Sequence, residues 1–157
     1  DLKDILSYCP QTPFLFECSL LENLLFDDLK LENNIKKYEK EIKYYFLETG
    51  MIKRFDYLSL RKNMNLTLDN FSGGEKKRIS LIRTWLRDCK IEILDEPTES
   101  LDLKSAGKVI DIIKKRSKDR IIIVATHNKL LIDNATQIID LDYIHKDKII
   151  SLYKSGY

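Results

Sequence analysis

The chain has 157 residues, which is enough for one compact domain, or for one domain with a small lobe. Apolar residues make up 43% and charged residues 33% of it, a composition typical of globular rather than disordered proteins. A net charge of +2, from 27 basic and 25 acidic residues, gives no electrostatic reason to expect binding to nucleic acid or to an anionic membrane. Three cysteines without a C-x-x-C pair favour a reducing cytosol over a disulfide framework or a zinc site.

The first 70 residues are predicted to contain a short strand, a loop and a helical lobe. Residues 5–9 read as a strand that leads into a loop in which two prolines flank Gln11 and prevent regular structure. From about residue 19 to residue 60, apolar residues recur at helical spacing between faces rich in Lys and Glu. A polar stretch at 61–70 ends this pattern.

The next segment alternates helices and strands. A helix is predicted over residues 75–87, with Ile79, Ile82 and Leu86 as its buried stripe. It is followed by two short apolar strands, joined by an amphipathic helix that buries one apolar face. The strands are expected at 91–94 and 120–125, the helix at 104–118, and the buried face at Ala106, Val109, Ile110 and Ile113. A βαβ unit of this kind belongs to a parallel sheet covered by helices.

The C-terminal segment is predicted to close the sheet. One helical turn is expected at 130–134, and strands at 137–141 and 148–153 are expected to form an antiparallel edge hairpin. Glu92 lies inside a predicted strand, where a charge must be paired or lie at the sheet margin. The predicted fold class is therefore α/β, with a small helical subdomain and a C-terminal edge hairpin.

Polar residues follow both strands of the βαβ unit. Asp95 and Glu96 lie at the carboxyl end of the first strand, where open parallel sheets place their ligand sites. One carboxylate can hold a hydrated Mg²⁺ and the other can orient or deprotonate a water; the alternative is a loop that caps the strand. His127 follows the second strand, which would bring it near the carboxylates unless it is a structural or surface histidine. Gln11 can offer its amide to a metal or a water from the proline-stiffened loop.

A second candidate site lies at the start of the 75–87 helix. Ser72, Gly73 and Gly74 precede the helix, where free amides and the positive end of the helix dipole favour an anion such as phosphate. The alternative is an ordinary helix start, with Ser72 as N-cap and Glu75 completing a capping box. Both interpretations can hold together.

Taken in order, these segments resemble the motifs of ATP-binding-cassette (ABC) ATPases over almost the whole chain. The resemblance rests on a Q-loop at 8–11, a signature motif at 71–75, a Walker B strand at 91–96, the run into the D-loop at 97–102 and a switch histidine at 126–127. Segments 14–16 and 21–23 are similar to those of exporter-type members. The family's fold implies a P-loop NTPase-like parallel sheet flanked by helices, here incomplete.

The resemblance implies that ATP and Mg²⁺ bind at the sheet. Glu96 would polarise the hydrolytic water, and His127 would contact the γ-phosphate. Asp95 would hold Mg²⁺ through water, and Gln11 would help to sense the metal and the γ-phosphate. These roles define an ATPase of the ABC type.

The resemblance also implies partners. A second nucleotide-binding domain would pack head to tail with ATP between the two. Ser72, Gly73, Gly74 and Glu75 would cradle phosphate across that dimer, and Asp102 would link the two sites. The Q-loop and the helical lobe would receive the transmembrane domain of a transporter, which places the chain at the cytoplasmic face of a membrane. The segments would divide into a Q-loop region at 1–18, a helical subdomain at 19–70, and a signature helix with the distal half of the ATPase core at 71–157.

The sequence departs from the family at its phosphate-binding loop. No G-x-x-x-x-G-K-[ST] motif is present, so this chain alone is expected not to turn over ATP. Glu75 stands where the family usually has Gln, as in some of its branches. An incomplete sheet would expose apolar edge surface, so self-association or strand exchange between copies is expected.

The predicted function is the ATP-binding and hydrolysing part of an ABC transporter, with export favoured. One alternative is an ABC ATPase of the DNA-maintenance type, which also favours S-G-G-E but carries long coiled coils that this chain lacks. Another is a non-enzymatic interaction module that completes a site with a partner. Intact Glu96 and His127 argue against that second alternative.

Overall fold

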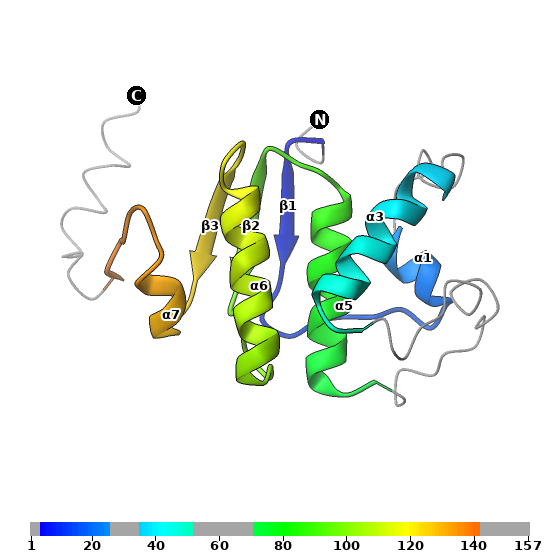
Figure 1. The fold of residues 1–157 in the computed structure, drawn as a ribbon, viewed down its shortest axis with the longest axis horizontal. Coiled ribbons are helices and arrows are strands. Elements are labelled where there is room, and N and C mark those ends of the chain that lie inside the picture. The colour runs from blue at the N-terminus through cyan, green and yellow to red at the C-terminus, as the bar shows by residue number, and fades with distance from the viewer. Residues whose placement is uncertain (1–3, 26–34, 52–70, 142–157) are drawn as a thin grey trace, which may run out of the picture.

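The computed structural model describes residues 4–25, 35–51 and 71–141 of the chain. Figure 1 shows a central group of strands with α6 in front of it, and α1 and α3 grouped beside α5. None of the helices in these ranges has both the length and the apolar character needed to cross a membrane.

Three strands form one parallel sheet in the order β1 (Leu6–Cys9), β2 (Ile91–Asp95) and β3 (Ile121–Ala125). Central β2 pairs with both neighbours, and Leu94 lies in one row with its partners Cys9 and Val124. Because all three strands run in the same direction, their carboxyl ends meet at one edge of the sheet. The predicted parallel α/β architecture is confirmed.

The two long helices of the distal half, α5 (Gly73–Leu86) and α6 (Leu103–Arg116), bury the faces that the sequence predicts. Ile79, Ile82 and Leu86 of α5 are each at most 1% exposed. On α6, the predicted face of Ala106, Val109, Ile110 and Ile113 is buried as well. The 3.6-residue period of the apolar positions accounts for both helices.

The described residues cover the two faces of the sheet unequally. Side chains alternate across a strand, so neighbours in sequence report on opposite faces. Cys9 and Leu94 point to the covered face and are 0% exposed, whereas Tyr8, Ile121 and Ile123 are 53%, 61% and 52% exposed. Parallel sheets are normally covered on both faces. The described part of the chain therefore leaves the face of the sheet that carries Tyr8 and Ile123 uncovered.

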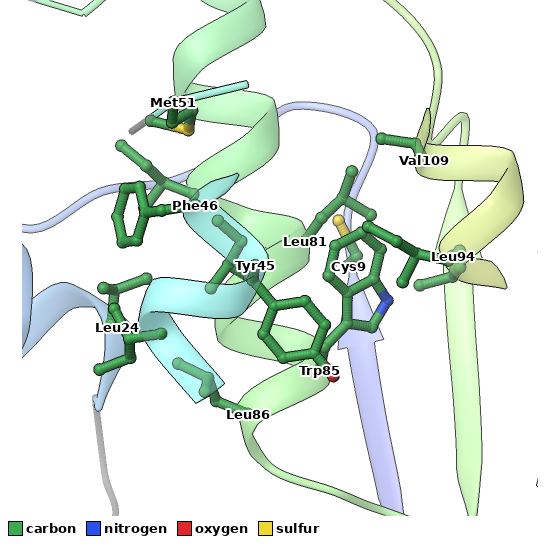
Figure 2. Close-up of a cluster of buried hydrophobic side chains, with 14 of the residues drawn as sticks. Cys9, Leu24, Tyr45, Phe46, Met51, Leu81, Trp85, Leu86, Leu94 and Val109 are labelled. Atoms are coloured by element: carbon green, nitrogen blue, oxygen red, sulfur yellow. The ribbon is translucent and has the colours of Figure 1, made fainter. Parts of the chain in front are cut away.

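Two helices of the predicted helical lobe pack against α5. These are α1 (Leu20–Leu24) and α3 (Ile35–Glu48), while the predicted polar stretch at 61–70 lies outside the described residues. Figure 2 shows Tyr45 of α3 beside Trp85 of α5, and their ring centroids lie 5.2 Å apart. The apolar core thus continues from the sheet into the lobe.

A charged cluster lies inside this core. Glu92 of central β2 is 0% exposed, and its Oε1 accepts hydrogen bonds from Nε of Arg116 at 3.0 Å and from a terminal nitrogen of Arg120 at 3.3 Å. Arg116 also donates to the hydroxyl of Tyr45 and to the carbonyl of Trp85. The charge that the sequence places in this strand is therefore paired, although the strand is central.

The C-terminal hairpin was predicted wrongly in its first strand. A short helix, α7 (Lys129–Ile132), follows β3 as expected, but no strand forms at 137–141. Ile138 and Ile139 are 61% and 69% exposed. An alternating apolar pattern forms a strand only where a neighbouring backbone pairs with it, and no described strand pairs with this segment. The second predicted strand, at 148–153, lies outside the described residues.

Candidate active site

The carboxyl ends of β2 and β3 bring Glu96, Thr126 and His127 into contact. Oε2 of Glu96 accepts a hydrogen bond from the hydroxyl of Thr126 at 2.9 Å, and Oε1 accepts one from the backbone amide of His127 at 3.0 Å. Nδ1 of His127 lies 2.7 Å from the same Oε1. A carboxylate can only accept, so in this contact Nδ1 carries a proton and donates.

The backbone at Glu96 is also unusual. Its φ of 42° lies in the left-handed region, which non-glycine residues rarely adopt. The amide of Glu96 donates to the carbonyl of Ala125 at 2.9 Å, and this bond together with the side-chain contacts holds the conformation in place. Such strained positions concentrate at functional sites. The Glu96 side chain is 13% exposed, whereas that of His127 is 88% exposed.

Asp95 points away from Glu96, to the open face of the sheet. Its Oδ2 accepts a long hydrogen bond of 3.4 Å from the hydroxyl of Tyr8 on β1. Desolvation, and next the negative charge of Asp95, raise the pKa of Tyr8 above its ordinary value. Tyr8 was not singled out by the sequence, although strand alternation places it on the same face as Asp95.

Gln11 lies in the loop that follows β1, at the same edge of the sheet as Glu96 and His127. Its side chain is exposed. Its backbone carbonyl accepts a hydrogen bond of 3.0 Å from Nζ of Lys77 on α5. Lys77 is 1% exposed and was not among the residues that the sequence analysis selected.

The turn at Ser72 forms the predicted capping box. The hydroxyl of Ser72 accepts from the amide of Glu75 at 3.3 Å, and the carboxylate of Glu75 accepts from the amide of Ser72 at 2.8 Å. This occupies the side chains of both residues, and the amides of Gly73 and Gly74 lie in the first turn of α5. The predicted anion site at this helix start stays a prediction.

The loop after Glu96 packs against this turn. A Cβ on Gly74 would lie 2.7 Å from the carbonyl oxygen of Ser100, so only glycine allows this approach. Asp102 caps α6, since its carboxylate accepts from the amide and the hydroxyl of Ser105 at 3.0 and 2.6 Å. These hydrogen bonds lower the pKa of Asp102. Arg78 of α5 donates to the same hydroxyl at 3.1 Å, which ties the two helices together.

The oxygen donors at this edge of the sheet suit a cation that takes most of its ligands from water and phosphate oxygens. No group of three or more His, Cys, Asp or Glu side chains that could hold a metal occurs among the described residues. Mg²⁺ in phosphate-transfer sites is bound by one or two carboxylates together with waters and phosphate oxygens. Asp95 and the exposed amide of Gln11 fit that requirement, because they offer oxygen donors without forming a closed cage.

Comparison with known proteins relates the chain to one family. The family described as ABC transporter matches residues 1–99. HrtA of Staphylococcus aureus, named as a hemin import ATP-binding protein, is 34% identical over 96 residues, which are 60% of this chain and 43% of HrtA. A protein of Rickettsia typhi named as an export ATP-binding/permease protein is 32% identical over 155 residues, which are 96% of this chain and 25% of that protein. The chain therefore spans less than half the length of these relatives.

Solved structures show the same fold. An ATP-binding subunit of an ABC transporter matches with a TM-score of 0.66 at 21% identity, over 83% of this chain and 52% of that one. A bacterial Atm1-family ABC exporter with ATP bound matches with a TM-score of 0.68 at 20% identity, over 85% of this chain and 23% of that one. The family match over residues 1–99 and the relative from Rickettsia typhi show that the chain belongs to the ABC transporter family and is part of its ATP-binding domain.

Proposed function

We propose that the chain contributes the water-activating half of an ABC ATPase site and couples ATP hydrolysis to export across a membrane. The observation that supports this most is the Glu96 carboxylate, which Thr126 and His127 hold at the carboxyl end of the sheet. An oriented carboxylate of this kind can accept a proton from an attacking water.

The residues at this edge divide the work. Glu96 accepts the proton of the water, and the exposed ring of His127 faces the γ-phosphate once that group approaches, to which Nε2 donates when it carries a proton. Asp95 and Gln11 are the residues that would hold Mg²⁺. When bound, Mg²⁺ neutralises charge on the phosphate oxygens.

The second half of each site comes from a partner. The amides of Gly73 and Gly74, in the turn that Ser72 and Glu75 cap, receive the phosphate bound by a second nucleotide-binding domain. Asp102 lies in the loop between the two sites and links them. A transmembrane domain docks on the loop after β1 and the helical lobe, which places the chain at the cytoplasmic face of the membrane.

The chain by itself does not turn over ATP in this proposal, because the sequence holds no G-x-x-x-x-G-K-[ST] loop. A test of Glu96 therefore uses the longer protein that contains this chain together with such a loop. Glu96→Gln keeps the size of the side chain and removes its basicity. We expect ATP turnover to fall by roughly 10²–10⁴-fold, the usual contribution of a general base, while calorimetric titration still detects ATP binding.

The matched control is Asp111→Asn, which removes an exposed carboxylate from α6 and leaves turnover unchanged. If Glu96→Gln and the parent hydrolyse ATP at equal rates, the catalytic proposal fails. The chain would then act as an interaction module that completes a site with its partner.

A further inference from the structure

A buried lysine joins three segments of the candidate site. The ammonium of Lys77 donates to the carbonyl of Pro10 at 3.0 Å, to that of Gln11 at 3.0 Å and to that of Asp95 at 2.8 Å. An ammonium group has three donors, so these three carbonyls use all of them. The side chain is 1% exposed, and the three groups that it contacts here are neutral carbonyls, not carboxylates.

Burying a charge without an ion-pair partner is costly unless hydrogen bonds replace its water shell. Desolvation lowers the pKa of Lys77, and the acidic groups around it, Cys9 and Glu99 first and Asp95 and Glu96 after them, oppose that shift. An uncharged residue of similar size would avoid the cost of burying the charge but would leave the three carbonyls without this donor. This cost indicates that Lys77 holds the three carbonyls in position, and that its charge is not there to stabilise the fold.

Lys77 is the last contact of a row that joins α5 to β1. Thr84 donates to the carbonyl of Tyr8 at 3.4 Å, and the hydroxyl of Ser80 lies 3.4 Å from the sulfur of Cys9. Lys77, Ser80 and Thr84 share one face of the helix at the spacing i, i+3, i+7. The row follows the strand to its end and continues into the loop that carries Gln11.

We propose that Lys77 is a positioning residue that ties the loop of Gln11 to the end of β2, so that a shift of the signature helix α5 moves both together. The contacts of Lys77 do not depend on the proposed function. Only the interpretation of this movement as communication between two ATP sites rests on it. Gln11 and Asp95 are the two residues assigned to Mg²⁺, and α5 begins at the turn assigned to the phosphate of the partner site. One side chain thus couples the metal-holding residues of one site to the phosphate-holding turn of the other.

The direct test measures the order of the loop in this chain. In Lys77→Met the side chain keeps most of its length but loses all three hydrogen bonds. We expect the NMR order parameter of the Gln11 amide to fall from about 0.85, typical of a rigid backbone, to below about 0.6. The amides of α6 serve as an internal reference and keep their order parameters.

The matched control is Lys76→Met, which removes the neighbouring, half-buried ammonium of the same helix. It leaves the Gln11 amide ordered. An unchanged order parameter at Gln11 in folded Lys77→Met overturns the proposal, as does an equal loss in the control. A purely structural role would loosen the reference amides of α6 to the same degree.

A second measurement needs no variant and decides the matter if Lys77→Met does not fold. Protons that are buried and hydrogen-bonded exchange slowly with water. The ammonium of Lys77 should therefore give a slowly exchanging NMR signal, unlike the exposed lysines, and exchange as fast as theirs would overturn the proposal. Neither measurement involves nucleotide. If Glu96→Gln leaves ATP turnover intact while Lys77→Met loosens Gln11, the proposed function fails and the role of Lys77 in the fold remains.

Discussion

The two ends of β2 each hold a glutamate, in opposite settings. Glu92, near the amino end, is fully buried between the guanidinium groups of Arg116 and Arg120, which do not lose their protons. Glu96, just past the carboxyl end, is bound by neutral hydroxyl and amide donors and by the exposed ring of His127. The first charge is cancelled inside the core. The second is oriented but not neutralised, so it stays available for chemistry.

The amino-end cluster also connects the lobe to the core. Arg116 lies at the last turn of α6 and donates to the hydroxyl of Tyr45 on α3 and to the carbonyl of Trp85 on α5. Burial raises the pKa of Tyr45, so its hydroxyl keeps its proton at neutral pH. The carboxyl end of β2 has no comparable set of fixed charges among the described residues. The comparison suggests that one end of the strand serves stability and the other serves function.

The largest effect on stability is expected from breaking the amino-end cluster. Arg116→Met leaves Glu92 buried with only its longer contact to Arg120. Removing one partner of a buried ion pair typically costs about 3–5 kcal/mol of unfolding free energy. Urea unfolding followed by the fluorescence of Trp85, the only tryptophan of the chain, measures this loss.

Glu96→Gln is the matching change at the other end of the strand. Its side chain is 13% exposed and can keep the hydroxyl and amide contacts in part, so we expect a loss of about 0.5–1.5 kcal/mol of unfolding free energy, the net contribution of one hydrogen bond. A loss at Glu96 as large as that at Arg116 would contradict the contrast between the two ends.

Local patterns were sufficient to predict most of the fold. The apolar period of α5 and α6 and the short apolar runs of β2 and β3 each agree with the structure. The segment at 137–141 shows the limit of such reasoning. Its alternation resembles that of a strand, but strand formation depends on a pairing partner elsewhere in the chain, which a local pattern does not contain.

The candidate site was likewise predicted only in part. Glu96 and His127 follow predicted strands, so the rule for parallel sheets was enough to bring them together. Lys77 was missed because a lysine in a basic run is normally exposed, and its burial depends on three carbonyls from distant segments. The signal that could have indicated it is the polar spacing of Lys77, Ser80 and Thr84, which marks a second buried face of α5.

A moderate effect on stability is expected from replacing Gly74, which packs against the loop that follows β2. In Gly74→Ala the new Cβ would lie 2.7 Å from the carbonyl oxygen of Ser100, and a backbone atom cannot give way without moving its loop. Overpacking of this kind costs about 1–3 kcal/mol. The same unfolding experiment measures it.

Gly107→Ala is the matched control, because Gly107 lies inside α6 and a Cβ there meets nothing within 4 Å. It should raise the unfolding free energy by about 1 kcal/mol through better helix propensity. If both substitutions stabilise the chain, the Ser100 loop yields easily and the carboxyl end of β2 is less closely packed than its contacts suggest.

The smallest effect concerns Asp102, the N-cap of α6. Its pKa is lowered by the hydroxyl and the amide of Ser105, so the folded state favours the charged form. Asp102 therefore contributes stability above its unfolded pKa of about 3.9, and loses it as the pH falls through the lower folded value. Ser105→Ala removes the hydroxyl, the larger of the two causes, and should raise the pKa of Asp102 toward the ordinary value. A titration of the Asp102 carboxyl carbon by NMR measures the shift.

Ser117→Ala is the control for this titration, since its hydroxyl donates to the carbonyl of Lys114 at the opposite end of α6. It should leave the pKa of Asp102 unchanged. An equal pKa in the native chain and in Ser105→Ala would mean that the amides of the first turn hold Asp102 without the hydroxyl. The hydrogen bond from Arg78 to the hydroxyl of Ser105 would then tie α5 to α6 without affecting the charge of the Asp102 cap.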